Sequence, residues 1–198
     1  MCMKTIIITE ERPLKNEFEY IEAILNEGID NIQIRKPLLS DNYIRVILDN
    51  IKEEYHSKLI LNGKFSLVDT YKNIGGIHTN SHNKIIPQNF KGIKGYSCHT
   101  LKEIESKKEI FDYLFLSPIY DSISKEGYKA KFSFTELKNA TEKGIVSEKV
   151  YALGGITPDK ITQIKELGFG GVVFMGYIWN SKDINEIIKK IKLIKSYV

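Results

Sequence analysis

Ser97 and His99 stand two positions apart in the stretch Gly-Tyr-Ser-Cys-His-Thr of residues 95–100. A run typical of a short strand precedes this stretch, and a segment with helical spacing follows it. An imidazole titrates near neutral pH, so His99 is a candidate general acid or base. A lone histidine also serves as a helix cap or a solvated side chain, and the sequence leaves both interpretations open.

Gln33 and Arg35 share one face of another predicted strand, because alternate residues of a strand point the same way. The fork of an arginine is suited to a phosphate or a carboxylate of a ligand. Pairing of Arg35 with a neighbouring carboxylate of the chain is an equal alternative. Asn62 and His78 end the next two predicted strands and are expected at the same mouth.

Gly154 and Gly155 follow an apolar run and lead through Ile-Thr-Pro into a predicted helix. Their amides are unencumbered by side chains, and a helix N-terminus favours an anion. Gly176 follows the last apolar run, and barrels often bind phosphate in the loops after strands seven and eight. We therefore expect a phosphate here, although a tight turn alone would also explain the two glycines.

The loop at residues 121–131 contains Ser122, Ser124 and Lys125. Two hydroxyls and an ammonium group suit an anionic substrate, but exposed loops are often rich in serine and lysine for solubility alone. His78 and His82 are four residues apart, and no nearby carboxylate completes a metal site with them.

Apolar runs of strand length alternate with helical patterns along the chain. Strands are expected at residues 4–9, 30–35, 58–62, 75–78, 91–98, 112–116, 149–153 and 170–175. Helices are expected at residues 16–26, 41–54, 65–72, 100–108, 133–143, 158–167 and 183–197, with Ser40 and Ser133 as N-caps. Residues 80–90 are polar and hold Pro87. This order predicts the α/β class and a single (β/α)8 TIM barrel over residues 1–198, with the fourth helix reduced or missing.

The bulk composition is that of a soluble globular protein, with 42% hydrophobic and 27% charged residues among 198. The net charge of +4 is spread along the chain, so no nucleic-acid partner is expected. Cys2 and Cys98 form no CxxC pair, which favours a reducing cytoplasm over a disulfide framework. No apolar run approaches membrane-spanning length. The oligomeric state stays open, a homo-oligomer included.

Short segments in a fixed order extend over nearly the whole chain. They are Gln-Ile-Arg at 33–35, Leu-Asn at 61–62, Gly-Gly-Ile-His at 75–78, the stretch 95–100, Asp-Tyr at 112–113, Ser-Pro-Ile-Tyr at 117–120, Ser-Ile-Ser-Lys at 122–125 and Ala-Leu-Gly-Gly-Ile at 152–156. In order and spacing together they resemble the thiamine phosphate synthase/TenI family, whose fold is the barrel expected above.

For a synthase, the resemblance implies the joining of hydroxymethylpyrimidine diphosphate to a thiazole phosphate, with magnesium and loss of diphosphate. The residues implied for the pyrimidine diphosphate are Gln33, Arg35, Asn62, Ser97 and Lys125. Those implied for the thiazole phosphate are Ser122, Ser124, Gly155 and the backbone near Met175 and Gly176.

Four departures from the synthase pattern bear on this expectation. Lys36-Pro37 stands where the pattern has Glu-Lys, and Gly176 stands where it has a serine. Gly63 and Asn83 stand where it has the two magnesium aspartates. Departing diphosphate carries concentrated negative charge that magnesium normally neutralises, so losing both carboxylates is a physical objection.

The TenI branch needs no magnesium, and its characterised relatives isomerise a carboxylated thiazole phosphate by moving a proton. The resemblance places His99 at the proton carrier of that branch. Our first expectation is therefore a TenI-like thiazole tautomerase without a cofactor, with His99 as acid/base, Arg35 on the substrate carboxylate and Gly154, Gly155 and Gly176 on the phosphate. The alternatives are a divergent synthase, which would use Mg²⁺, and a silent relative that only binds thiazole phosphate.

Overall fold

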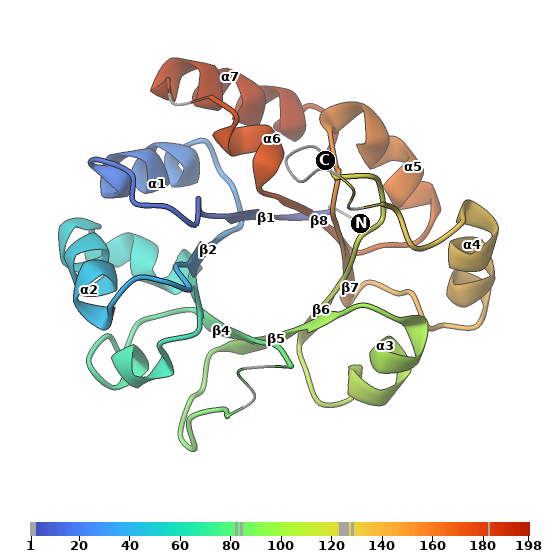
Figure 1. The fold of residues 1–198 in the computed structure, drawn as a ribbon, viewed down its shortest axis with the longest axis horizontal. Coiled ribbons are helices and arrows are strands. Elements are labelled where there is room, and N and C mark those ends of the chain that lie inside the picture. The colour runs from blue at the N-terminus through green and yellow to red at the C-terminus, as the bar shows by residue number, and fades with distance from the viewer. Residues whose placement is uncertain (1–2, 82, 84, 123–126, 128, 182) are drawn as a thin grey trace.

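The computed structural model describes residues 3–81, 83, 85–122, 127, 129–181 and 183–198. Eight parallel strands pair in chain order and close into a barrel with the helices outside (Figure 1). The strands are β1 (Lys4–Ile8), β2 (Asn31–Arg35), β3 (Leu59–Asn62), β4 (Gly76–Thr79), β5 (Ile93–Cys98), β6 (Tyr113–Leu116), β7 (Val150–Leu153) and β8 (Gly171–Phe174). The predicted TIM barrel is confirmed.

Seven α-helices and three short 3-10 helices occupy the described residues between and after the strands. The α-helices are α1 (Glu17–Asn26), α2 (Asp41–Asn50), α3 (Leu101–Lys107), α4 (Phe134–Glu142), α5 (Ile161–Glu166), α6 (Gly176–Trp179) and α7 (Ile184–Lys195). The 3-10 helices are η1 (Glu53–Lys58), η2 (Phe65–Asp69) and η3 (Pro158–Lys160). Among the described residues between β4 and β5 there is no helix, which confirms the expected gap.

The helix predicted at residues 41–54 was too long. Ile51 has extended backbone angles that end α2, and η1 follows separately. The buried ring of His56 explains the break, because its Nε2 lies 3.2 Å from the carbonyl oxygens of both Leu48 and Ile51. Those carbonyls would otherwise lack partners at the helix end. The short helix predicted at 65–72 is the 3-10 helix η2, which ends earlier, at Asp69.

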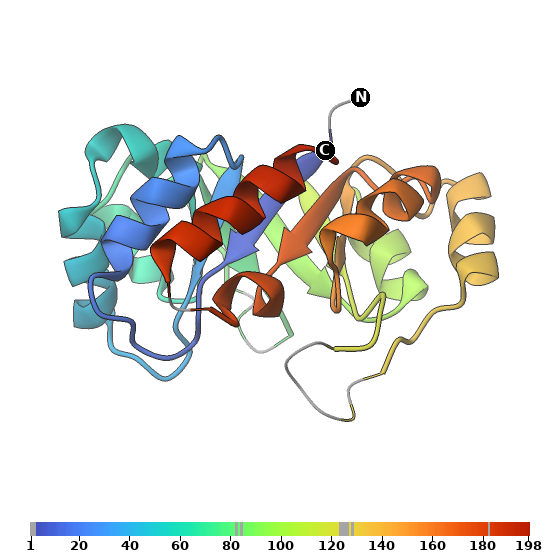
Figure 2. The same ribbon diagram turned by 90° about the horizontal axis from the view of Figure 1, so that it is seen from above.

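The short helix α6 was missed by the sequence analysis. Four residues are too few for a 3.6-residue hydrophobic period to show. The indole Nε1 of Trp179 donates to the carbonyl of Ile8 at 2.7 Å, which holds the helix against the end of β1. In side view α6 lies just beyond the carboxyl ends of the strands, and the C-terminus lies at the other end of the barrel (Figure 2).

The capping signals in the sequence were correct. The hydroxyl of Ser40 accepts from the amide of Tyr43 at the start of α2. Ser133 and Glu136 form a complete capping box at the start of α4. Such caps satisfy backbone donors that have no partner within the helix.

Two apolar clusters build the core. One fills the barrel interior and comprises Ile6, Ile8, Ile60, Tyr113, Phe115 and Val173. The larger one lies between the strands and the outer helices. Strands buried on both faces are expected of a parallel barrel, and they explain the near-continuous apolar runs of the sequence. In the described part of the chain, no helix has the length and apolar character needed to cross a membrane.

Candidate active site

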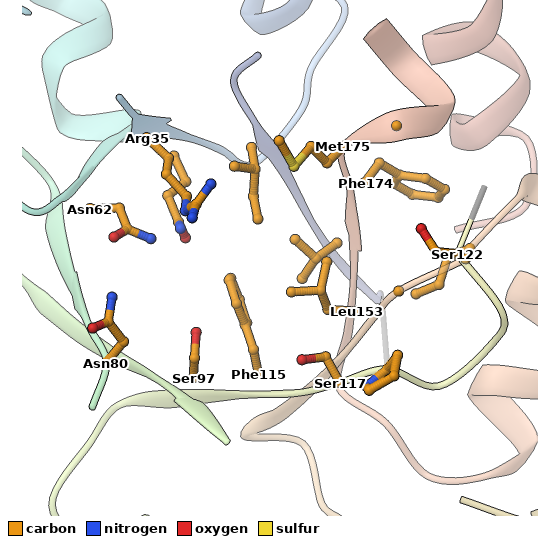
Figure 3. Close-up of a pocket in the computed structure, with 18 of the residues that line it drawn as sticks. Arg35, Asn62, Asn80, Ser97, Phe115, Ser117, Ser122, Leu153, Phe174 and Met175 are labelled. Atoms are coloured by element: carbon orange, nitrogen blue, oxygen red, sulfur yellow. The ribbon is translucent and has the colours of Figure 1, made fainter. Parts of the chain in front are cut away.

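A cavity of about 380 Å³ opens at the carboxyl ends of the strands. Figure 3 shows Arg35, Asn62 and Asn80 on one side of it, Ser122 on the other, and Ser97, Phe115 and Ser117 along a third edge. Ten of the predicted site residues line it, namely Gln33, Arg35, Asn62, Ser97, His99, Ser122, Gly154, Gly155, Met175 and Gly176. The predicted residues Ser124 and Lys125 lie outside the described residues, and His78, which was expected at the same mouth, is buried and does not line the cavity.

Several lining residues were not predicted as site residues. They are Glu11, Asn80, Ser81, Ser117 and Tyr177 among the polar ones and Ile8, Phe115, Pro118, Leu153, Ile156, Val173 and Phe174 among the apolar ones. Most of the apolar members lie on strands and are indistinguishable in sequence from other core residues, whereas Pro118 and Ile156 lie in the loops after β6 and β7. Position after a strand could have indicated Glu11 and Ser117, since strand-end loops form the mouth of a barrel.

Arg35 forms an ion pair with Glu11 at the rim of the cavity. The two side chains are 32% and 33% exposed. This is the pairing with a neighbouring carboxylate that the sequence left open. Exposed ion pairs typically contribute about 0–1 kcal/mol. An anionic ligand could therefore replace Glu11 on the guanidinium at little cost, so the pairing does not remove Arg35 from the site.

Lys36 does not reach the cavity. Its ammonium group is fully buried 2.7 Å from the Glu17 carboxylate and donates to the carbonyl oxygens of Glu10 and Arg12. Burial raises the pKa of Glu17, and the ammonium of Lys36 opposes that rise. The lysine that departs from the synthase pattern thus fixes the loop on both sides of Glu11.

Ser97 is held from below by a buried histidine. The Oγ of Ser97 lies 2.8 Å from Nε2 of His78, and the Nδ1 of that ring lies 3.0 Å from the hydroxyl of Tyr113. The His78 ring stacks on Phe115 with 4.3 Å between centroids. Burial, with a smaller effect of Arg35, lowers the pKa of His78 to about 3. His78 is therefore neutral and orients Ser97 instead of exchanging protons with a ligand.

His99 combines both roles that its position suggested. Its backbone amide donates to Glu103 at 2.6 Å, beside the capping box that Thr100 and Glu103 form on α3. Its exposed side chain lines the cavity, with Nδ1 3.2 Å from the carbonyl oxygen of Ser117. The hydroxyl of Ser117 also lies 3.3 Å from this nitrogen, so Nδ1 can donate to the carbonyl oxygen or accept from the hydroxyl. In either tautomer the ring is held at the cavity, where an imidazole can serve as an acid or a base.

Gln33 presents an acceptor without a donor. Its side chain is only 1% exposed and lines the cavity, and its Oε1 has no hydrogen-bond partner among the described residues. Buried polar atoms are rarely left in this state, because the lost hydrogen bond costs about 1–3 kcal/mol. The atom is therefore suited to a ligand that brings an N–H or O–H donor.

The two glycines after β7 are needed for a close approach. Gly154 and Gly155 have positive φ angles of 101° and 64°. A β-carbon at Gly155 would lie 2.1 Å from the carbonyl oxygen of Asp121. Gly155 and Gly176 line the cavity, and within the described chain their amides donate to no acceptor. The turn explains why glycine is required, and the open amides can still receive an anion.

The residues present do not fit a magnesium ion held by the protein. Gly63 and Asn83 are neighbours in space, since a β-carbon at Gly63 would lie 3.3 Å from Nδ2 of Asn83. The structure thus brings the two family positions together, but neither carries a carboxylate. No cluster of three or more possible metal ligands among His, Cys, Asp and Glu occurs in the described residues. Magnesium is usually held through one or two carboxylates.

A family model described as thiamine monophosphate synthase matches residues 5–178 of the chain. The chain belongs to this family. The match extends from β1 into α6 and so includes every described residue of the cavity. The family expectation from the sequence is confirmed.

Named relatives and a solved structure are similar over most of the chain. A putative thiamine-phosphate synthase 2 of Aquifex aeolicus is 29% identical over 168 residues, covering 80% of this chain and 87% of that protein. A thiamine-phosphate synthase of Clostridium tetani is 27% identical over 197 residues, covering 93% and 89%. The crystal structure of a thiamine phosphate pyrophosphorylase from Bacteroides thetaiotaomicron is 33% identical, with a TM-score of 0.89 and coverage of 98% and 97%.

Proposed function

We propose that this protein is a thiamine-phosphate synthase, which joins hydroxymethylpyrimidine diphosphate to a thiazole phosphate and releases diphosphate. The names of its relatives support this alternative better than the tautomerase that we expected first. The observation that carries the proposal within the site is the unsatisfied Oε1 of Gln33.

The Gln33 acceptor separates the two candidate substrates by their chemistry. The pyrimidine carries an exocyclic amino group, whose N–H can donate to Oε1. A carboxythiazole phosphate has only acceptors and anionic oxygens at neutral pH, so it would leave Gln33 unsatisfied and add repulsion. A buried acceptor strongly discriminates between ligands that supply its hydrogen bond and ligands that do not.

The two ends of the cavity suit the two anionic groups. Arg35, Asn62 and Ser97 would receive the diphosphate on one side. The open amides of Gly155 and Gly176 would receive the thiazole phosphate on the other, since backbone amides bind phosphate oxygens well. The apolar floor between them would hold the two rings in contact.

The coupling exchanges one bond for another. The C–O bond between the pyrimidine methylene and the diphosphate breaks, and its electron pair leaves on the diphosphate. The lone pair of the thiazole nitrogen forms the new C–N bond to the methylene carbon. No proton transfer is required. The negative charge on the departing diphosphate is stabilised by hydrogen-bond donors of this chain, chiefly Arg35 and Ser97, because positions 63 and 83 carry no carboxylate for magnesium.

A thiazole tautomerase remains the second candidate because of one contact. Ser117 holds Nδ1 of His99 through its carbonyl oxygen and its hydroxyl, and the imidazole lines the cavity. A proton shift needs an acid/base and an anion site but no metal, which agrees with the residues at positions 63 and 83. In this reaction His99 would be indispensable, whereas in coupling it would be secondary.

Titration calorimetry with two pyrimidine ligands tests the proposal at Gln33. Hydroxymethylpyrimidine diphosphate should bind, and the analogue with hydrogen in place of the amino group should bind roughly 5- to 100-fold more weakly. The Gln33→Leu variant, which has no acceptor, should lose most of this difference. Equal affinities for the wild type would contradict the assignment of Gln33, and no binding of either ligand would contradict the synthase proposal.

A further inference from the structure

Three residues form a row across three neighbouring strands beneath the cavity. His78 of β4 is in register with Gly95 of β5, and Gly95 is in register with Tyr113 of β6. A β-carbon at Gly95 would lie 2.1 Å from Cζ of Tyr113. The glycine therefore leaves the space through which the tyrosine ring extends over β5 to reach the histidine.

The hydrogen bonds of this row have one favoured assignment of donors and acceptors. Tyr113 is buried, and His78 is the only hydrogen-bond partner of its hydroxyl among the described residues. If Nδ1 carried a proton toward Oη, the O–H of Tyr113 would be left without an acceptor in the core. Such a buried donor is costly, so the state in which Tyr113 donates to Nδ1 is favoured by roughly tenfold or more.

The position of the proton on His78 determines the direction of its hydrogen bond with Ser97. With its lone pair on Nδ1 occupied by Tyr113, a neutral imidazole carries its proton on Nε2. Nε2–H then donates to Oγ of Ser97 at 2.8 Å. The hydroxyl hydrogen of Ser97 cannot point at His78 and is left to point into the cavity that this side chain lines.

We propose that Tyr113 and His78 are positioning residues that fix the Ser97 hydroxyl as a hydrogen-bond donor toward the ligand. Neither residue lines the cavity. They act through Ser97 and select ligands that present an acceptor there. The identity of that acceptor rests on the proposed function: it is an oxygen of the diphosphate, which gains negative charge as the C–O bond breaks.

Two further features agree with a fixed direction of the hydrogen bond between His78 and Ser97. The stacking of His78 on Phe115 and its complete burial prevent the ring from turning over to exchange its nitrogens. Burial also holds the pKa of this imidazole at about 3, so no second proton disturbs the chain near neutral pH. Among the described residues, Arg35 is the charged group that adds to this lowering of the pKa.

Nitrogen NMR of histidine-labelled, ligand-free protein tests the proton direction without any substrate. His78, assigned by comparison with a His78→Gln variant, should show the Nε2–H tautomer in the wild type. In Tyr113→Phe, which keeps the ring and loses only the hydroxyl, this single tautomer should give way to a mixture. An Nδ1–H tautomer or an imidazolium in the wild type would overturn the proposal, whether or not the protein couples its substrates.

Binding of inorganic diphosphate tests the consequence for Ser97. Tyr113→Phe should weaken binding about 2- to 10-fold in the wild type and have no effect when Ser97 is already alanine. Tyr151→Phe is the matched control, because Tyr151 stacks on Tyr113 without bonding through its hydroxyl to any described residue. The same loss from Tyr113→Phe with and without Ser97 would show a merely structural role and overturn the proposal.

Discussion

Glu11 forms an ion pair with Arg35 at the rim of the cavity, so the guanidinium offered to a ligand is already held by the chain's own carboxylate. Lys36 fixes this arrangement by binding the carbonyl oxygens of residues 10 and 12, on either side of Glu11. Lys36, which follows β2 and departs from the synthase pattern, is therefore connected to the site through the loop that it holds.

Replacing Glu11 should strengthen anion binding. Glu11→Gln removes the competing charge and leaves a side chain of similar size, so inorganic diphosphate should bind about 2- to 5-fold more tightly by calorimetry. Glu105→Gln removes the same charge from an exposed position on α3, and it should leave the affinity for diphosphate unchanged. Weaker binding in Glu11→Gln would mean that the carboxylate supports the ligand instead of competing with it.

Breaking the buried ion pair should destabilise the fold. Lys36→Met leaves the Glu17 carboxylate buried without its cation, at a cost of about 3–5 kcal/mol in the free energy of unfolding. The double variant Lys36→Met/Glu17→Met should recover most of this loss. Chemical denaturation measures both, and a single variant as stable as the wild type would contradict the structural role of Lys36.

The same variant has a predictable pH dependence. Without Lys36, burial raises the pKa of Glu17 further above its ordinary value. A raised pKa in the folded state means that the folded protein binds more protons than the unfolded chain, so stability falls as the pH rises through this range. The loss in Lys36→Met relative to the wild type should be larger at about pH 7.5 than at about pH 5. A constant loss would show that Glu17 does not titrate.

Buried His78 should make the wild type sensitive to acid. Its pKa of about 3 lies below the ordinary value of 6.5, so the unfolded chain binds more protons between these values. Stability is therefore lost as the pH falls from 6.5 toward 3, by at most about 1.4 kcal/mol per pH unit. His78→Gln should reduce this slope in denaturation measured at several pH values. An unchanged slope would show that His78 titrates normally.

Two aspartates should create a metal site where the structure has none that fits. Gly63 and Asn83 are adjacent, so Gly63→Asp/Asn83→Asp would place two carboxylates together. Manganese titration should show a site in the double variant and none of comparable affinity in the wild type. The positive φ of 83° at Gly63 will cost some stability. Equal manganese binding by the two proteins would contradict our description of the site.

The barrel could be predicted from the sequence because parallel strands buried on both faces give continuous apolar runs. The strand-end polar residues followed from that order, and Gln33, Arg35, Ser97 and His99 all line one cavity. What the sequence does not contain is the partner of each group. Alternation along β2 puts Gln33 and Arg35 on one face but cannot show that one is unsatisfied and the other paired.

The row beneath Ser97 shows the same limit. Gly95 and Tyr113 were placed on predicted strands and in segments that resemble the family, but the sequence did not connect them with His78. Their relation depends on the register of β4, β5 and β6, which brings residues far apart in the sequence side by side. Ser97 thus gains a defined hydrogen-bond direction that spacing alone cannot give.

The central claim is tested most directly by one measurement of products. The purified protein is mixed with hydroxymethylpyrimidine diphosphate and thiazole phosphate in magnesium-containing buffer, and separately with carboxythiazole phosphate. Our account predicts thiamine phosphate and diphosphate in equal amounts, exceeding the amount of protein, and retained activity in His99→Ala. Isomerisation of the carboxythiazole that His99→Ala abolishes, with no thiamine phosphate formed, would contradict it.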